Sequence, residues 1–330
     1  MTPVGQGPVR AGPRVGNVVF LASFVSLACT DDLLPGELVL GADLVEDVAY
    51  GEENARLGAS VATDGESVLA IAPGVPATWH DGELRQGTVL STGFTADRGA
   101  WEAGQGVLRF LETGEEFVLA GDERALASDP ADEAGTVYSV GPSGLRDVVR
   151  GGVYLPGFGY DALAVESERV ALRDCDGEQC QLFWIRTWSS EPVQPAGESL
   201  GLNLVQGLPA VTGAGLAWND GALCAGDPQS DVDDGAGYVS CDDGTHVAGL
   251  VGDHLGQAIS GGYAAGEFNK WIVPARTRVV PLRGGDVLAL ERGAEAQPTS
   301  LAVHDGLVVI GQPYEMHGGM NVGAVHTVQP

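Results

Sequence analysis

Short apolar runs recur along the chain from residue 36 onward, and Gly, Pro, Asp or Asn separates each run from the next. Examples are ELVLGA, SVLAIA, EFVLAG, TVYSV, LVVIG and AVHTV. No long stretch shows the apolar period of about 3.6 residues, with caps, that marks an amphipathic helix. The pattern therefore predicts an all-β fold of many short strands joined by turns. The 50 glycines agree with this, because Gly tolerates positive φ at little steric cost.

The same order of features repeats within the chain. A strand, an Asp-Gly turn, a second strand and a loop entered through proline follow one another in residues 57–73, 215–228 and 300–313. Residues 107–122 and 162–174 keep this order, with Thr-Gly and Ser-Glu at the turn. The spacing of the turn glycines indicates a unit of about 40–50 residues, which is the size of a propeller blade.

Units of this size cannot bury their apolar faces alone and must stack on neighbours, and a closed ring of them leaves few exposed edges. Five clear units and a weaker one at 255–275 predict a β-propeller of six four-stranded blades, or seven. We expect an N-terminal strand, GELVL (36–40), to close the ring beside the C-terminal unit. A β-sandwich or an open β-solenoid is the alternative that satisfies the same alternation.

Two short signatures, one dipeptide and one tripeptide, mark the units. One is the literal Phe158-Gly159, with the variants Leu57-Gly58 and Leu255-Gly256. The other, Gly-Ala-Pro, has its counterparts in Ile71-Ala72-Pro73, Ala225-Gly226-Asp227-Pro228 and Ile310-Gly311-Gln312-Pro313. With these signatures most of the chain after residue 40 resembles the FG-GAP repeats of integrin α-subunit propellers and their bacterial relatives.

The calcium loop of that family, which lies between the first two strands of a repeat, has no counterpart here. Tight hairpin turns are expected in its place at Asp64-Gly65, Asp220-Gly221 and Asp305-Gly306. The resemblance therefore implies the fold but not the bound calcium of the family.

The N-terminus has the features of an export signal. Residues 1–16 contain Arg10 and Arg14 and no acid, and the apolar stretch after them, up to Ala28, is too short to span a bilayer. Ala28 directly precedes Cys29, which resembles a bacterial lipoprotein signal, in which the cysteine becomes the lipidated first residue. We therefore predict a signal peptide over 1–28, a tether over 29–35 and a single propeller domain over 36–330. Because Ser26 stands where such signals prefer an aliphatic residue, ordinary signal cleavage is the alternative.

Lipidation of Cys29 would account for the odd number of five cysteines. The remaining four form two local pairs, Cys175 with Cys180 and Cys224 with Cys241, which we predict to be disulfides. Disulfides persist outside the reducing cytosol, so they agree with an exported protein of the cell envelope, an outer-membrane lipoprotein facing the periplasm or the exterior. A zinc site is the alternative, but the spacing lacks Cys-x-x-Cys and the neighbours are carboxylates.

The densest acidic stretch lies in residues 226–244. No cofactor is expected, although oxygen ligands at alternate positions suit Ca²⁺, for which the candidates are Asp227, Asp231, Asp233 and Asp234. A solvated acidic loop is the alternative.

Two further segments concentrate side chains that bind ligands. In LFWIRTW (182–188) strand alternation places Trp184, Arg186 and Trp188 on one face, as a surface for a sugar or a protein partner. Packing between blades is the alternative. In PYEMHGGMN (313–321) several polar side chains, among them Glu315 and His317, gather in one loop, which is either an active site or an ordinary polar loop.

No catalytic motif is present: the chain lacks Gly-x-Ser-x-Gly, His-Glu-x-x-His and a phosphate-binding glycine loop. A net charge of −28 opposes contact with phosphate backbones, which excludes nucleic acid as an expected partner. The sequence therefore predicts a non-catalytic, lipid-anchored extracytoplasmic propeller that binds or displays a protein or glycan partner, with no catalytic residues. The alternatives are a polysaccharide-active hydrolase or lyase with acids in the propeller funnel, and a structural subunit of a surface complex.

Overall fold

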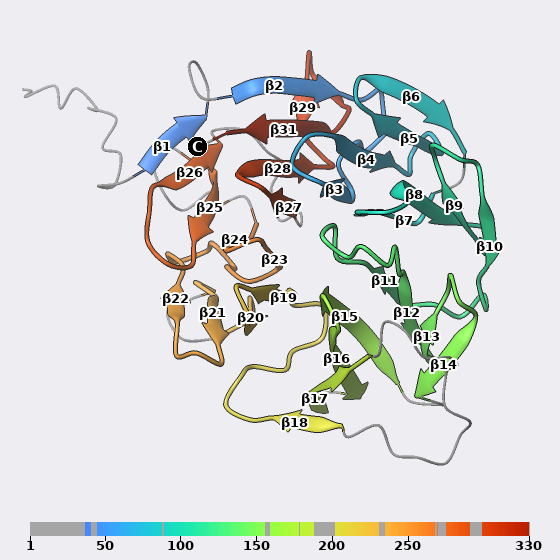
Figure 1. Ribbon diagram of the computed structural model, residues 1–330. Coiled ribbons are helices and arrows are strands. Elements are labelled where there is room, and N and C mark those ends of the chain that lie inside the picture. Colours follow the sequence, from blue (N-terminus) through green and yellow to red (C-terminus); the bar gives the residue numbers. More distant parts are fainter. Residues whose placement is uncertain are drawn as a thin grey trace, which may run out of the picture. The chain divides into compact units, whose positions relative to one another are not determined.

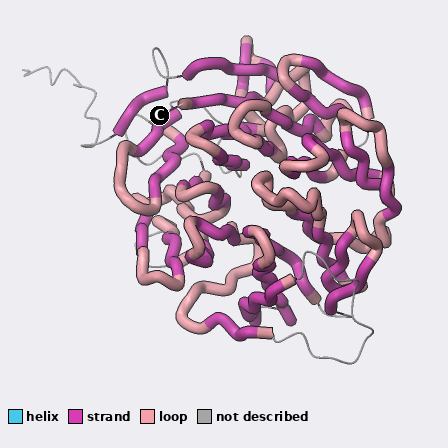
Figure 2. Tube along the Cα trace, in the orientation of Figure 1, coloured by secondary structure: helices cyan, strands magenta, loops and turns pink. Residues whose placement is uncertain are grey.

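Strands and turns make up the described part of the chain, and no helix occurs in it. The computed structural model describes residues 37–40, 45–87, 89–155, 159–177, 179–187, 202–230, 235–267, 269, 275–290 and 299–329. The described residues all lie within the compact unit Leu33–Pro330, and the fold is that of this unit. This unit is a ring of seven blades around a central channel (Figure 1, Figure 2). The all-β propeller prediction is confirmed, with the larger of the two blade numbers.

Each blade contains four antiparallel strands. The first four blades use strands in chain order. Blade 1 contains β3 (Val61–Thr63), β4 (Val68–Ala72), β5 (Ala77–His80) and β6 (Glu83–Gln86), and blade 2 contains β7 (Ser91–Thr95), β8 (Gly99–Gly104), β9 (Val107–Phe110) and β10 (Glu116–Val118). Blade 3 contains β11 (Ala125–Ala127), β12 (Tyr138–Gly141), β13 (Gly144–Asp147) and β14 (Gly152–Leu155), and blade 4 contains β15 (Tyr160–Glu166), β16 (Arg169–Asp176), β17 (Gln179–Arg186) and β18 (Asn203–Val205).

Blade 5 also uses strands in chain order, whereas blades 6 and 7 include the N-terminal strands. Blade 5 contains β19 (Leu216–Asn219), β20 (Ala222–Asp227), β21 (Tyr238–Cys241) and β22 (His246–Ala248); blade 6 contains β23 (Ala258–Ser260), β24 (Tyr263–Ala265), β25 (Thr277–Pro281) and β26 (Val287–Leu290), with β1 (Glu37–Leu40) added outside; blade 7 contains β27 (Ser300–His304), β28 (Leu307–Gln312), β31 (Ala324–Val328) and β2 (Val45–Tyr50). A small hairpin, β29 (Met316–His317) and β30 (Met320–Asn321), projects from blade 7.

An N-terminal strand closes the ring, as predicted, but it is not GELVL. The closing strand is β2, which pairs antiparallel with β31 and supplies the outer strand of blade 7. The GELVL segment, β1, instead pairs parallel with β26 as a fifth strand of blade 6. The prediction missed β2 because Glu46 and Asp47 interrupt its apolar alternation, whereas β1 carries the stronger apolar pattern.

The hairpin turns follow the prediction at two of three sites. Asp220-Gly221 and Asp305-Gly306 are two-residue turns with positive φ at both positions, the geometry that favours Asp-Gly. At Asp64 the expected two-residue turn is wrong, because four residues separate β3 from β4. There the carboxylate of Asp64 accepts the N–H groups of Glu66 and Ser67, which holds a longer turn. The predicted unit at 107–122 is the outer hairpin β9–β10, not an inner one.

The hydrophobic core lies between blades. The second strands β4 and β28 are buried along their whole length, since each is covered by neighbouring blades on both faces. This burial explains why VLAIA and LVVIGQ are continuous apolar runs rather than alternating ones.

At the boundary of blades 7 and 1 the two backbones meet at glycines. A Cβ on Gly58 (φ +87°) would lie 2.4 Å from the carbonyl oxygen of Ala324 and 2.8 Å from the Cα of Gly311. The N–H of the adjacent Leu57 donates to the carbonyl oxygen of Val322 at 3.2 Å. Leu57-Gly58 and Gly311 are two of the sequence signatures, and they meet across this boundary.

The boundary of blades 5 and 6 repeats this arrangement. A Cβ on Gly256 (φ +102°) would lie 2.7 Å from the carbonyl oxygen of Tyr238 and 2.8 Å from the Cα of Gly226. The N–H of Leu255 donates to the carbonyl oxygen of Ala236 at 3.0 Å. We refer to these two boundaries as the glycine junctions.

Both predicted disulfides are present, Cys175–Cys180 and Cys224–Cys241. Each joins directly opposed residues of a hairpin, β16–β17 in the first case and β20–β21 in the second. The pairs indicate an oxidising, extracytoplasmic location. Among the described residues no helix is long and apolar enough to cross a membrane.

Candidate functional site

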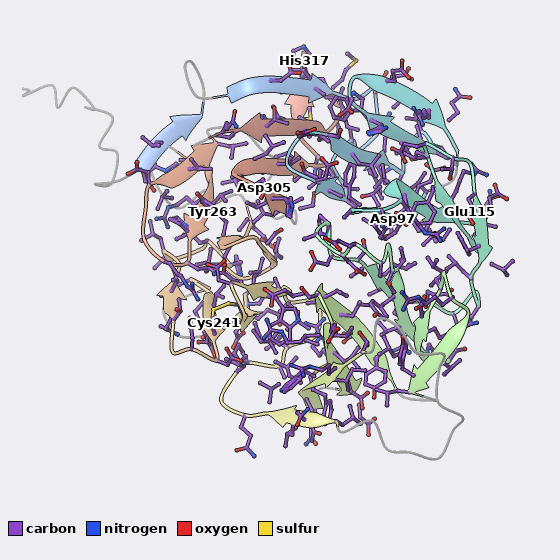
Figure 3. All side chains as sticks on the ribbon, viewed as in Figure 1. Asp97, Glu115, Cys241, Tyr263, Asp305 and His317 are labelled. Carbon is purple, nitrogen blue, oxygen red and sulfur yellow. A yellow bond between two sulfur atoms is a disulfide. The ribbon has the colours of Figure 1, made fainter. Side chains whose placement is uncertain are left out.

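The central channel is a cavity of about 850 Å³. The innermost strands of all seven blades line it, and both polar and apolar side chains form its walls. The turns that join the first and second strands of blades 3 to 7 bring polar residues to one mouth of the channel. Figure 3 places Asp305 and Tyr263 toward the centre of the ring and Glu115 on its outer side. The arrangement is an open funnel with a wall of mixed polarity and a polar rim.

The carboxylate of Asp129, at the rim, joins two blades. It is buried, and its two oxygens accept the N–H of Ala131 at 2.9 Å and the N–H of Ser167 at 2.6 Å. Ser167 lies in the turn of blade 4, whereas Asp129 belongs to the turn region of blade 3. Because a carboxylate that accepts backbone N–H groups is held in one place, Asp129 fixes this part of the mouth.

Carboxylates also link the blades at the next two boundaries, through a backbone N–H at one and an ion pair at the other. Glu166 of blade 4 accepts the N–H of Gly221 in blade 5 at 3.1 Å and pairs with Arg169. Oδ2 of Asp220 in blade 5 accepts a hydrogen bond from Nη1 of Arg283 in blade 6 at 3.0 Å. Three carboxylates at the mouth are therefore partners in bonds that link blades 3, 4, 5 and 6.

An aromatic side chain in the channel wall carries an unused donor. Trp218 lies under the guanidinium of Arg169, whose Cζ is 4.3 Å from the ring centroid. The buried Nε1–H of Trp218 has no hydrogen-bond partner among the described residues. A buried donor without a partner is uncommon and can serve a ligand or water in the channel.

The predicted surface on β17 is only partly described. Trp184 packs against the cluster of Ala164, Ala171 and Leu223 between blades 4 and 5, so interblade packing accounts for this side chain. Arg186 is exposed, and Trp188 lies outside the described residues.

The predicted calcium loop is also incompletely described. Asp227 ends β20, and it contributes to the raised pKa of Tyr238, for which burial is the main cause. Asp231, Asp233 and Asp234 lie outside the described residues, as does Cys29. Among the residues that are described, no group of three or more Asp, Glu, His and Cys is arranged to hold a metal ion.

The loop 313–321 reinforces ring closure. Glu315 is buried, and its Oε2 lies 2.6 Å from Nε2 of His326 in β31. The ring of His317 stacks on that of Tyr50 in the closing strand β2, with centroids 4.2 Å apart. These contacts give the loop a structural role. Sequence reasoning named Glu315 and His317 but could not pair Glu315 with His326.

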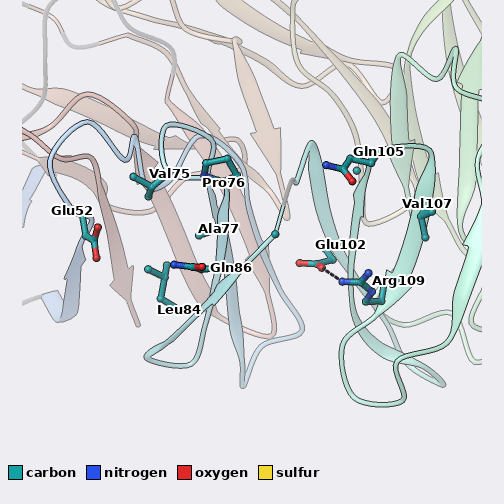
Figure 4. Close-up of a pocket in the computed structure, with 12 residues that line it drawn as sticks. Glu52, Val75, Pro76, Ala77, Leu84, Gln86, Glu102, Gln105, Val107 and Arg109 are labelled. Carbon is teal, nitrogen blue, oxygen red and sulfur yellow. Dashed lines mark hydrogen bonds and ion pairs between the residues drawn. The ribbon is translucent and has the colours of Figure 1, made fainter.

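A second cavity, a groove of about 640 Å³, separates blades 1 and 2 (Figure 4). Glu102 lies in it and joins the two blades: its Oε2 accepts the hydroxyl of Thr78 at 2.6 Å, and its Oε1 lies 3.3 Å from Nη1 of Arg109. Exposed Leu84 lines the opposite wall. No sequence signal indicated this groove, because its lining comes from separate strands of two blades.

Asp147 has a buried carboxyl outside both cavities. Burial raises the pKa of Asp147, and the N–H of Arg150 and its guanidinium charge oppose that rise. Asp147 belongs to β13, away from the channel mouth.

No protein-family model matches the chain, and no curated protein matches its sequence. Among solved structures, a streptogramin B lyase has a TM-score of 0.53 at 12% identity, over 85% of this chain and 97% of that one. Virginiamycin B lyase from Staphylococcus aureus has a TM-score of 0.49 at 10% identity, over 86% of this chain and 98% of that one. The WD40 domain of Toxoplasma gondii coronin has a TM-score of 0.49 at 11% identity, over 87% of this chain and 88% of that one. At 12% identity, the likeness to the streptogramin B lyase supports the β-propeller fold and nothing beyond it.

Proposed function

We propose that this chain is a lipid-anchored, extracytoplasmic β-propeller that binds or displays a partner at its channel mouth and catalyses no reaction. The observation that carries the proposal is that the carboxylates at the rim are bonded to neighbouring blades. Asp129, Glu166 and Asp220 each link one blade to the next, so they serve the architecture of an open, polar-rimmed funnel. Such a concave site, lined by apolar side chains and by polar groups in fixed positions, suits ligand binding.

The partner we favour is a protein that presents a basic segment. The net charge of −28 attracts a cationic partner, and Asp305 at the rim is 82% exposed at its side chain. A glycan partner is the second candidate. It rests on the face that the sequence predicts for Trp184, Arg186 and Trp188, and the packing of Trp184 between blades 4 and 5 argues against it.

We further propose that the repeats are of the FG-GAP type. The support is the pairing of signature glycines at the two glycine junctions, Gly58 with Gly311 and Gly256 with Gly226. The calcium of that family is not part of this proposal. A separate proposal is a Ca²⁺ site in the loop that begins at Asp227, which Asp227→Asn should weaken in a calcium titration.

Photo-crosslinking tests the binding proposal. A photoreactive residue at Asp305 should capture a discrete basic protein from the native cell envelope, and capture should fall at high salt. The control is the same residue at Val118, which is 82% exposed on the outer edge of blade 2. Equal capture at both positions would contradict a site at the mouth. Cleavage of a polysaccharide by the purified chain, abolished in Glu166→Gln or Asp220→Asn, would establish the enzyme alternative.

The anchoring proposal has its own test. Cys29→Ser should move the protein from the membrane fraction to a soluble exported fraction. Fatty-acid labelling that leaves Cys29 unmarked would contradict lipidation.

A further inference from the structure

Blade 6 carries one strand more than its own sequence provides. Its strands β23 to β26 form a complete antiparallel sheet, and β1 lies outside β26 (Figure 1). The β1–β26 pairing is parallel, whereas the other strand pairings within the described blades are antiparallel. Since β2 closes the ring, β1 is not needed for closure. Its contribution must come from the residues that it covers.

β1 covers buried charge. The carboxylate of Glu37 pairs with the guanidinium groups of Arg276 and Arg278, and the side chains of Glu37 and Arg276 are each 1% exposed. The Nε of Arg278 lies 2.6 Å from Glu37, and its Nη1 lies 2.5 Å from Asp253. Among the described residues Glu37 is the carboxylate paired with Arg276. Without β1, Arg278 would keep Asp253, whereas Arg276 would have no carboxylate partner among the described residues, and an unpaired buried charge is costly.

The edge of blade 6 also favours an apolar residue directly after the acid. Glu37 stands opposite Val287, and Leu38 stands opposite Leu288 in continuous register. The side chain of Leu38 packs against the cluster that contains Val279 and Leu288. The edge therefore fits an extended segment that presents a carboxylate and then an apolar residue, with backbone hydrogen bonds supplying affinity.

We propose that the outer edge of blade 6 is a strand-accepting site for the segment Glu37–Leu40, and that a second copy of this chain can supply this segment by exchange. Each copy carries a matching strand, and the contacts made are the same in either arrangement, so exchange costs little. Residues 41–44 alone connect β1 to β2. β1 can therefore leave blade 6 while β2 keeps the ring closed.

Disulfide trapping between two copies tests the exchange. Val39 and Ala289 are opposed in the β1–β26 register. Two full-length variants are prepared, both with Cys29→Ser: one carries Val39→Cys and the other carries Ala289→Cys. One of the two is enlarged by a tag, and the variants are then mixed and mildly oxidised. The expected result is a linked heterodimer on a non-reducing gel. Adding Glu37→Ala to the Val39→Cys chain should reduce its yield several-fold, because the arginines then lose their carboxylate.

The matched control is the closing strand. Ala49 and Val325 are opposed in the β2–β31 register, and chains with Ala49→Cys and Val325→Cys should give no heterodimer above background. A single chain with both Val39→Cys and Ala289→Cys should close an internal disulfide, which verifies the register and the folding of the variants. An internal bond in that chain, with no more heterodimer in the mixture than in the β2–β31 control, would overturn the proposal. If the internal disulfide does not form in the double variant, the proposal is overturned as well.

Discussion

Two kinds of blade boundary can be compared in this propeller. At the glycine junctions the leading segment of one blade lies directly on the backbone of the previous blade, as Gly58 lies on Gly311. At the boundary of blades 2 and 3 a large side chain fills the interface instead: Trp101 is buried, and its Nε1 donates to the hydroxyl of Ser128 at 2.9 Å. Gly93 leaves room for the indole, since a Cβ there would lie 2.3 Å from the ring.

The difference shows what each boundary demands of the sequence. A glycine junction requires the absence of a side chain, so a single added carbon disturbs backbone atoms that cannot move aside. The Trp101 boundary requires a filled volume and one hydrogen bond, so a substitution leaves a space that neighbours can partly close. The first kind of boundary should therefore be the less tolerant.

The largest effect is expected at the glycine junctions. Gly58→Val and Gly256→Val should each destabilise the fold by about 3–5 kcal/mol, because they combine positive φ with a backbone clash. Denaturant unfolding measures this loss. The control is Gly82→Ala, which has the same φ of +87° as Gly58 but nothing within 4 Å, and should cost only about 1 kcal/mol. Equal losses at Gly58 and Gly82 would show that the close approach does not matter.

The disulfides should come next. Replacing Cys224 and Cys241, which are buried in the cluster beside Leu255 at a glycine junction, should cost about 3 kcal/mol for a separation of 17 residues. Replacing Cys175 and Cys180 should cost about 2 kcal/mol for a separation of 5.

A mild reductant should open the half-buried pair Cys175–Cys180 before the buried pair Cys224–Cys241, because access limits thiol attack. Timed alkylation with mass mapping measures the order. The reverse order would show that the junction of blades 5 and 6 opens more readily than its packing indicates.

A smaller effect is expected at the filled boundary. Trp101→Phe keeps most of the apolar volume and loses the hydrogen bond to Ser128, so it should cost about 1–2 kcal/mol. Thermal unfolding checks this value, with Ser128→Ala as the partner variant. A loss as large as that of Gly58→Val would remove the contrast between the two kinds of boundary.

The smallest effect concerns pH. The folded state binds the proton of Asp147 more tightly than the unfolded chain does, because burial raises the pKa of this carboxyl. Its contribution to stability is therefore fully present below the unfolded pKa of about 3.9 and is lost as pH rises through the folded pKa. Asp147→Asn should flatten this decline in unfolding midpoints above pH 4, whereas exposed Asp305→Asn should not. A steeper decline in Asp147→Asn would contradict the sign.

The candidate site was much less predictable than the strands. Asp129 and Ser167 are 38 residues apart in the sequence, and Glu166 and Gly221 are 55 apart. Neither pair lies in a motif, and each depends on how adjacent blades pack. In this acidic chain a rim carboxylate looks the same in the sequence as a solvated one.

Local chemistry in the sequence determined the short strands, the Asp220-Gly221 and Asp305-Gly306 turns and the two disulfides, because each involves residues close together in the chain. The tertiary structure alone decided that β2 rather than β1 closes the ring. Both strands are short and apolar enough to pair with an edge, so their places depend on distant partners: β31 for β2, and the arginines of blade 6 for the carboxylate of Glu37. Pairings over such separations are set by the packing of the whole ring, which no local pattern encodes.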